Sequence, residues 1–156
     1  MWSRRLSASS NDASSPEERV LDRAVRALAR RDHSAESLRA KLARAGVPDD
    51  AQKDALETLE RAGYVDDARF ACARAEQLAA RGYGDEWIRA DLDAQGVAAE
   101  VAADAIAGLE PEVERAPGEW SRLRGGFVAA RTMARRGFAE ETLEALLAQD
   151  PSTGVG

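Results

Sequence analysis

The chain of 156 residues is poor in several residue types that other fold and function classes need. Aromatic residues make up only 5 % and there are five prolines, whereas Ala, Arg, Glu, Asp and Leu dominate. This composition favours helices and leaves strands short of the β-branched and aromatic residues that they prefer. Cys72 is the sole cysteine. An intrachain disulfide is therefore excluded, and a reducing cytoplasm is the expected location.

Groups that carry catalysis or ligand binding are scarce as well. His33 is the single histidine, and no second His or Cys stands at metal-ligand spacing from it. Gly82-Tyr83-Gly84 follows no predicted strand, so it does not qualify as a phosphate loop. No apolar run approaches the ~20 residues of a membrane-spanning helix, and the first residues lack the apolar stretch of a secretory signal. We expect a monomeric, non-enzymatic protein with no catalytic residues, cofactor, metal or membrane contact.

The net charge of −6 is spread unevenly along the chain. Residues 1–46 carry ten Lys and Arg against six Asp and Glu, residues 47–119 carry seven against eighteen, and residues 120–156 carry five against four. A uniformly basic DNA-binding protein does not have this distribution. A basic end beside an acidic middle favours a protein partner, or a surface divided by charge.

Three segments of the chain repeat one pattern without gaps. They are SAESLRAKLARAGVPDD (34–50), GDEWIRADLDAQGVAAE (84–100) and GGFVAARTMARRGFAEE (125–141), and each carries a glycine at the same position, Gly46, Gly96 or Gly137. The offsets of 50 and 41 residues are in the range of helical repeats. Because one short repeat is expected not to bury its own apolar face, we predict that neighbouring units share an apolar seam.

Helix-start and helix-end residues divide the chain into tandem units. Ser15 before Pro16 predicts the start of the first helix, and the repeated glycines predict helix ends. We predict an all-α fold of tandem three-helix repeats that form an elongated curved array. Its parts are a disordered N-terminal tail (1–15), unit 1 (16–65), unit 2 (66–110), a truncated unit 3 (111–149) and a tail (150–156). Pro111 and Pro117 predict that the first helix of unit 3 is short, kinked or frayed.

Two of the units carry motifs that are similar to those of a known family. The most specific stretch is GYVDDARF (63–70), followed by RGYG (81–84) and IRADL (88–92), while RGF (136–138) matches more loosely. In order and spacing these motifs resemble the RecX family of bacterial regulators of the RecA recombinase, over about residues 20–148. The family's structural motif falls here on Gly63, Tyr64, Asp66, Asp67, Phe70 and Gly82.

The resemblance implies a small regulator without catalysis of its own. RecX proteins bind RecA, typically in the groove of its filament on single-stranded DNA, and usually restrain its ATP hydrolysis and strand exchange. For this chain the resemblance implies RecA or its nucleoprotein filament as partner, weak binding to single-stranded DNA, and a role in homologous recombination, DNA repair and the SOS response. The alternatives are a helical-repeat adaptor for another protein and a helix-turn-helix-like nucleic-acid binder.

The candidate contact residues are arginines, one lysine and a tryptophan. The basic residues of unit 1 are interpreted either as a solvated helix face or as a patch for DNA phosphate or an acidic RecA surface, and those at helix ends also complement the helix dipole. Trp87 either anchors a partner or packs against the neighbouring unit, and the acidic Asp85 and Glu86 beside it argue against nucleic-acid contact by unit 2. The full set is Arg30, Arg31, Arg39, Lys41, Arg44, Arg81, Trp87, Arg89, Arg135 and Arg136.

The remaining motif residues have structural interpretations. Asp66 as an N-cap and Asp67 in the first turn of its helix explain this pair of carboxylates without any chemistry. Tyr64, Val65 and Phe70 are predicted to form the apolar seam between units 1 and 2.

Overall fold

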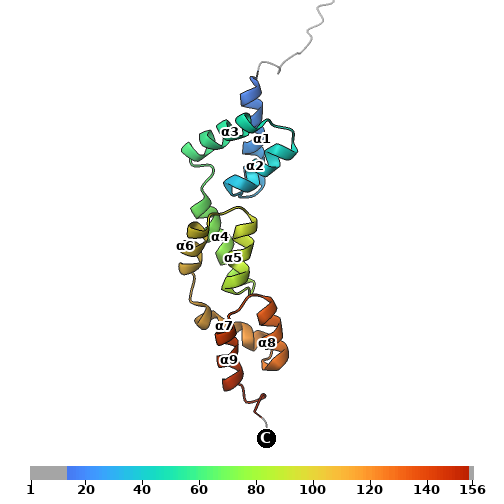
Figure 1. Ribbon diagram of the computed structural model, residues 1–156, viewed down its shortest axis with the longest axis vertical. Helices are drawn as coiled ribbons and strands as arrows, with labels where there is room; N and C mark the ends of the chain where they lie inside the picture. The colour runs from blue at the N-terminus through green and yellow to red at the C-terminus, as the bar shows by residue number, and fades with distance from the viewer. Residues whose placement is uncertain (1–13, 155–156) are drawn as a thin grey trace, which may run out of the picture.

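The computed structural model describes residues 14–154, and this part of the chain forms nine α-helices and no strand. Unit 1 holds α1 (Pro16–Arg30), α2 (Ala35–Arg44) and α3 (Asp49–Arg61); unit 2 holds α4 (Asp67–Ala80), α5 (Asp85–Ala94) and α6 (Ala99–Ala107); unit 3 holds α7 (Glu112–Arg122), α8 (Gly126–Arg135) and α9 (Glu140–Gln149). The three groups follow one another along the long axis of the molecule (Figure 1). The protein is therefore an elongated all-α array of tandem three-helix repeats. The predicted disordered tail lies almost wholly outside the described residues.

The helix boundaries follow from residues that the sequence marks out. The Ser15 hydroxyl accepts a hydrogen bond from the backbone N–H of Glu18 at 3.1 Å, and the Glu18 carboxylate accepts one from the N–H of Ser15 at 3.0 Å. This reciprocal pair fixes the start of α1. Gly46, Gly96 and Gly137 have φ angles of 83°, 75° and 83°. The repeated glycine thus ends each middle helix in the left-handed conformation, as predicted.

The first helix of unit 3, α7, has 11 residues and is shorter than α1 with 15 and α4 with 14, as predicted, but it is continuous over Glu112–Arg122 with Pro117 inside it. Proline at this position removes the N–H group that would bond to the carbonyl of Val113 in the first turn. Val113 is 64 % exposed, so water can take the place of the missing donor. Unit 3 consequently has three helices, as the other two units have.

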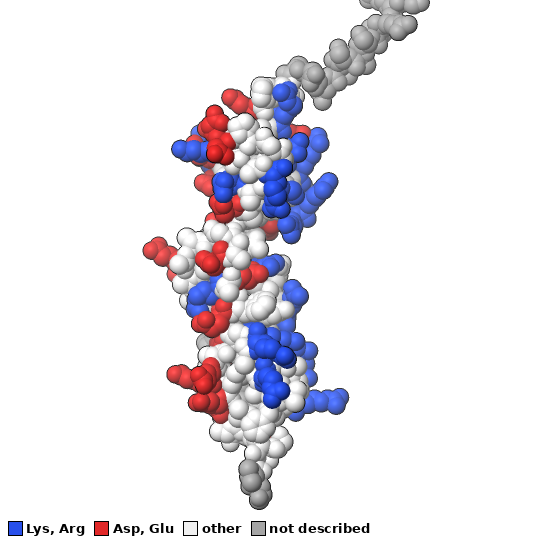
Figure 2. Space-filling model, turned by 45° about the vertical axis from the view of Figure 1, so that its right-hand side comes forward, with Lys and Arg blue, Asp and Glu red and all other residues white. Residues whose placement is uncertain are grey.

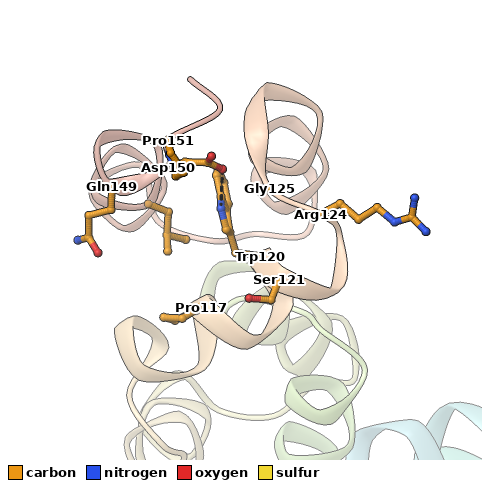
Figure 3. A pocket seen from close by; sticks show the side chains of 9 residues that line it. Pro117, Trp120, Ser121, Arg124, Gly125, Gln149, Asp150 and Pro151 are labelled. Carbon is orange, nitrogen blue, oxygen red and sulfur yellow. Dashed lines mark hydrogen bonds between the residues drawn. The ribbon is translucent and has the colours of Figure 1, made fainter. Parts of the chain in front are cut away.

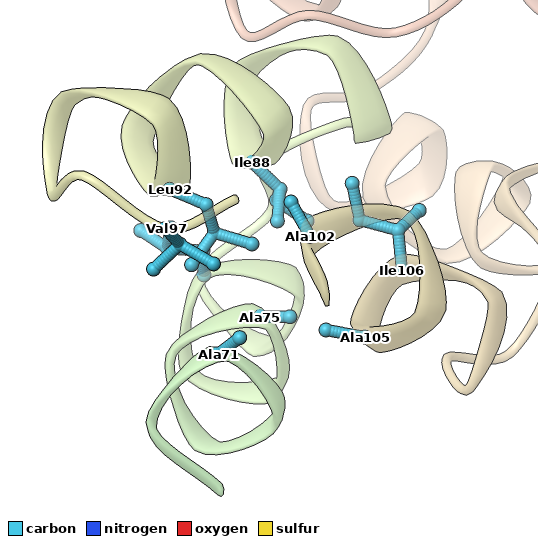
Figure 4. Packing of buried hydrophobic residues seen from close by; sticks show 9 residues of the cluster. Ala71, Ala75, Ile88, Leu92, Val97, Ala102, Ala105 and Ile106 are labelled. Atoms are coloured by element: carbon cyan, nitrogen blue, oxygen red, sulfur yellow. The ribbon is translucent and has the colours of Figure 1, made fainter. Parts of the chain in front are cut away.

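Each unit encloses an apolar core of its own, which contradicts the predicted shared seam. In unit 2, Ile88 and Leu92 of α5 lie over the small residues Ala71 and Ala75 of α4, and α6 closes the core (Figure 4). The helix pairs that pack closely lie within units. Small alanine side chains allow three short helices to approach one another closely, so each unit buries its own apolar residues.

The residues of the predicted seam are divided between units or exposed. Val65 is buried in the core of unit 1, and Phe70 packs, half-buried, against the core of unit 2. Tyr64 is 59 % exposed, so it belongs to neither core. Val65, Phe70 and Tyr64 therefore do not form one apolar seam between units 1 and 2.

Over residues 14–154, no helix combines the length and the apolar character that a membrane span requires. The same part of the chain has no cluster of three or more His, Cys, Asp and Glu side chains able to hold a metal ion. Cys72 lies exposed on α4.

Candidate partner-binding surface

Polar contacts join neighbouring units, and an acidic residue stands at the centre of each contact. Asp67, the first residue of α4, accepts a hydrogen bond on Oδ1 from the N–H of Ala35 at 2.8 Å. Glu112, the first residue of α7, accepts one on Oε2 from the N–H of Asp85 at 2.8 Å. Ala35 and Asp85 are the first residues of the middle helices α2 and α5. Because first-turn N–H groups lack intrahelical partners, each acid supplies the missing acceptor and complements the helix dipole.

These contacts define joint 1 between units 1 and 2, and joint 2 between units 2 and 3. Asp67 therefore stabilises the preceding unit, a role that its predicted place in the first turn of its own helix did not include. Asp66 is the N-cap of α4, as predicted, and accepts from the N–H of Arg69 at 3.0 Å. The adjacent carboxylates thus have separate tasks, one inside unit 2 and one across joint 1.

A second hydrogen bond, to a backbone carbonyl, recurs at equivalent positions of the two joints. In joint 1 the Ser34 hydroxyl donates to the carbonyl of Gln95. In joint 2 the N–H of Gly84 donates to the carbonyl of Arg136 at 2.8 Å. The two donors are 50 residues apart and the two acceptors 41 residues apart, which are the offsets of the sequence repeat. The repeated pattern therefore encodes the joints as well as the helices.

Joint 2 brings two glycines into backbone contact. A Cβ atom on Gly84 would overlap the main chain of Gly137, and a Cβ on Gly137 would overlap the main chain of Trp87. The other oxygen of Glu112 accepts from the N–H of Ala139 at 2.7 Å, which fixes the loop after α8 against the same point. Only glycine permits main chains to approach this closely.

The third middle helix, α8, is capped by an acid in the same way. Asp150, directly after α9, accepts a hydrogen bond from the N–H of Gly126 at 2.9 Å. It also accepts one from the indole N–H of Trp120 at 3.0 Å (Figure 3). Hydrogen bonds from the hydroxyl and the N–H of Ser152, followed by the one from Gly126, lower the pKa of Asp150 to about 2. The segment after α9, predicted as a tail, therefore begins with a residue that is tied to the core of unit 3.

His33 is a buried polar residue at joint 1. Its side chain lies next to Ser34, it is 5 % exposed, and its Nδ1 is 3.3 Å from the hydroxyl oxygen of Ser37. Its Nε2 has no hydrogen-bond partner within residues 14–154. Burial, and then the positive charges of Arg31 and Lys41, lower the pKa of His33 below its ordinary value. The neutral ring is thus the form that fits this joint.

A groove of about 470 Å³ in unit 1 is lined by regularly spaced cations. They are Arg19, Arg23, Arg26 and Arg30 of α1 with Lys41 of α2. The four arginines follow one another at intervals of four, three and four residues, which places them on one face of the helix. Asp22 is the acidic residue that lines the groove, and it pairs with Arg26 at 2.8 Å. We call these five cations the arginine groove.

The arginine groove contains only part of the predicted basic patch. Arg30 and Lys41 line it, whereas Arg31, Arg39 and Arg44 do not. The prediction missed Arg19, Arg23 and Arg26, although their helical spacing is readable in the sequence. These three arginines are separated by three or four residues along the chain, so a local concentration of charge does not mark them, whereas the face of the helix does.

Three other candidate arginines are engaged in ion pairs. Arg39 pairs with Glu36, Arg89 pairs with Glu86 at 3.0 Å, and Arg136 pairs with Glu119. Hydrogen bonds from Arg122, above all, lower the pKa of Glu119 below its ordinary value. Within the described part of the chain, the candidates without an acidic partner are Arg30, Arg31, Lys41, Arg44, Arg81 and Arg135.

Trp87 takes part in a stack of flat side chains at the start of α5. Its ring lies on that of Tyr83, with centroids 5.1 Å apart and an interplanar angle of 23°. The guanidinium carbon of Arg81 lies over the Tyr83 ring, 5.7 Å from its centroid. We call these three residues the aromatic stack. The main chain of Trp87 lies in joint 2, against Gly137. The residue is nevertheless 44 % exposed, so its ring contributes to the surface.

The carboxylates near Trp87 are neutralised by arginines of the same chain. Asp85 pairs with Arg115, Glu86 with Arg89, and Asp91 with Arg74 at 2.7 Å. Burial raises the pKa of Asp85 above its ordinary value, and the charge of Arg115 opposes this shift. The acidic character of the sequence around Trp87 therefore does not produce a free negative patch at the ring.

Positive and negative side chains gather on opposite long sides of the molecule. Figure 2 shows most of the visible Lys and Arg side chains on the right-hand half of all three units, and most of the Asp and Glu side chains on the left. The structure thus bears out the interpretation of the uneven charge as a surface divided by sign. One long side of the array is available to a negatively charged partner.

Units 1 and 2 each match the model of a known protein family. The first three-helix domain of RecX matches residues 21–59, and its second three-helix domain matches residues 66–106. A regulatory protein RecX of Stenotrophomonas maltophilia is 33 % identical over 145 residues, which cover 86 % of this chain and 89 % of that protein. A regulatory protein RecX of Xanthomonas axonopodis pv. citri is 35 % identical over 125 residues, covering 80 % and 69 %.

Solved structures show the same fold at low sequence identity. RecX from Lactobacillus salivarius superposes with a TM-score of 0.72 at 15 % identity, over 85 % of this chain and 95 % of that one. A second regulatory protein RecX superposes with a TM-score of 0.72 at 18 % identity, over 85 % and 73 %. The elongated arrangement of three-helix units is thus common to all three chains.

Proposed function

The chain belongs to the RecX family, and we propose that it binds the RecA filament on single-stranded DNA and restrains the ATPase and strand-exchange activities of RecA. It does so by occupying a surface of the filament, without catalysis of its own, in the cytoplasm. The role is regulation of homologous recombination and DNA repair. The observation that carries the proposal is the arginine groove of unit 1, together with the long side of the array on which Lys and Arg side chains predominate (Figure 2).

The charges of the arginine groove support a polyanionic or acidic partner surface. Arg23 and Arg30 are exposed and have no acidic partner within residues 14–154. Unpaired surface cations retain their full attraction for phosphate groups or carboxylates of a partner. An extended array presents such cations over a long distance, which suits a filament better than a compact partner.

The test is RecA-catalysed ATP hydrolysis and strand exchange on single-stranded DNA, followed as the purified protein is added. The test variant is Arg23→Glu/Arg30→Glu. The matched control is Lys53→Glu/Arg61→Glu, which makes the same change of charge at two exposed positions of α3. We expect the test variant to need an at least tenfold higher concentration for half-maximal restraint, on the order of two lost phosphate contacts, and the control to behave as the wild type.

Two results would contradict the proposal. The first is unchanged ATP hydrolysis and strand exchange when the wild-type protein is present in stoichiometric amount with RecA. The second is an equal loss of effect in both double variants, which would assign the effect to net charge and remove the arginine groove from the contact.

A further inference from the structure

We propose that the exposed ring of Trp87 is a stacking platform for an unpaired base of single-stranded nucleic acid. This goes beyond the proposed function, because it assigns a direct contact with nucleic acid to one side chain and names base stacking as the interaction. The observations are the aromatic stack, the free cations beside it and the neutralised carboxylates around it.

The geometry of the aromatic stack prepares the indole for such a contact. The Tyr83 ring lies 5.1 Å from that of Trp87, centroid to centroid, so it limits the rotation of the indole. Arg81 in turn lies over Tyr83. An indole that is held in place and 44 % exposed loses little conformational entropy when a base stacks on it. Every base has a π-face, so this contact tolerates any sequence.

The helix surface next to the ring leaves room for a flat ligand. Ala90 and Ala94 are three and seven residues after Trp87, on the same side of α5, and both are exposed. Asp91, four residues after Trp87, is held by Arg74. No bulky side chain of α5 therefore stands between this ring and a base.

Charge at joint 2 favours nucleic acid over a protein side chain as the ligand. Arg81 and Arg135 have no acidic partner in the described part of the chain, and Arg135 adjoins the loop of Gly137 that touches the main chain of Trp87. These cations can hold the phosphates on either side of a stacked base.

The experiment measures binding of the full-length chain to a fluorescently labelled oligo(dT) of about 15 nucleotides, by anisotropy at low salt. The second ligand is an abasic strand of the same length, which has the same phosphates but no bases. The variants are Trp87→Ala and Trp87→Phe. The matched control is Phe127→Ala, which removes an aromatic ring that is 67 % exposed on α8 and is not part of the aromatic stack. Far-UV circular dichroism and thermal melting verify that each variant is folded.

We expect the wild type to bind oligo(dT) more tightly than the abasic strand, by roughly 5- to 150-fold for one stacked base. Trp87→Ala should bind both strands with the affinity that the wild type has for the abasic strand. Trp87→Phe should keep part of the preference, and Phe127→Ala all of it. Quenching of tryptophan fluorescence by oligo(dT) should disappear in both Trp87 variants.

Equal affinity of the wild type for the two strands would overturn the inference, as would a preference that survives in Trp87→Ala or an absence of binding to oligo(dT). If Trp87→Ala weakens the effect on RecA while the base preference is unchanged or absent, the ring is a protein anchor and the inference is wrong. If Trp87→Ala loses the base preference but keeps its effect on RecA, the result supports the base contact and shows that the effect on RecA does not need the ring. The two proposals can thus fail independently.

Discussion

Replacing Glu112 by glutamine should weaken joint 2 without a change of size or shape. The carboxylate of Glu112 accepts one hydrogen bond from the N–H of Asp85 at 2.8 Å and one from the N–H of Ala139 at 2.7 Å, and the residue is 9 % exposed. Hydrogen bonds to a charged acceptor contribute about 1.5–3 kcal/mol each. Glutamine keeps one neutral bond of about 0.5–1.5 kcal/mol and turns its NH₂ group toward the second N–H. We therefore expect a loss of about 2–4 kcal/mol in unfolding free energy.

Amide hydrogen exchange, followed by NMR, locates this loss within the molecule. The amides of Asp85 and Ala139 should exchange faster in Glu112→Gln, while those in the core of unit 1 keep their protection, because the cores are separate. Urea denaturation gives the overall change in stability. Glu114→Gln is the control, because Glu114 lies exposed on the same helix and its carboxylate makes no hydrogen bond or ion pair within residues 14–154. A variant within about 0.5 kcal/mol of this control, with unchanged exchange at Asp85, would refute the reasoning.

Two further substitutions test joint 2 and joint 1. In urea denaturation, Gly137→Ala should lose about 1–3 kcal/mol more unfolding free energy than Gly46→Ala. Both glycines have positive φ, but only at Gly137 does the added Cβ meet the main chain of Trp87. Equal losses in the two variants would contradict the close approach. The folded-state pKa of His33 is lowered by burial, so its neutral form contributes full stability above the unfolded pKa of about 6.5 and loses it as the pH falls below that value. His33→Phe should therefore be less sensitive than the wild type to a change from pH 7.5 to 5.5 in urea denaturation, and equal sensitivity of the two proteins would refute the role of the ring.

The sequence predicted the helices and their order because those signals are local. The Ser15 capping box, the Asp66 N-cap and the repeated glycines all act within a few residues of the chain. The continuity of α7 was not predictable from Pro117 alone, since the cost of an internal proline depends on whether water reaches the carbonyl four residues before it. That exposure is a property of the folded unit.

The joints were harder to predict, because they depend on contacts between residues far apart in the sequence. Asp67 and Ala35 are 32 residues apart, and Glu112 and Asp85 are 27 apart. Each acid also has a satisfactory local explanation at the start of its own helix, and this explanation concealed the second role. The assumption of a shared apolar seam failed because a unit rich in alanine can close its core with three short helices.

The candidate surface shows the same division between local and distant information. The stripe of Arg19, Arg23, Arg26 and Arg30 could have been found from helical spacing, whereas the pairing of Arg136 with Glu119 across unit 3 could not. The sequence left the exposure of Trp87 open. Its neighbour Ile88 faces the core, but no motif shows whether the adjacent helix face meets solvent or the next unit.

Separate cores and polar joints together determine how the surface can be tested. Because each unit buries its own apolar residues, a substitution on the surface of one unit leaves the cores of the others intact. At Trp87 the main chain belongs to joint 2 and the ring to the surface. Trp87→Ala therefore removes the ring but keeps the backbone and the Cβ atom that contact Gly137, whereas Gly137→Ala disturbs the joint and leaves the ring in place. If joint and ring act independently, Gly137→Ala should lower the unfolding free energy but keep the preference for strands with bases. Trp87→Ala should keep the unfolding free energy and lose that preference.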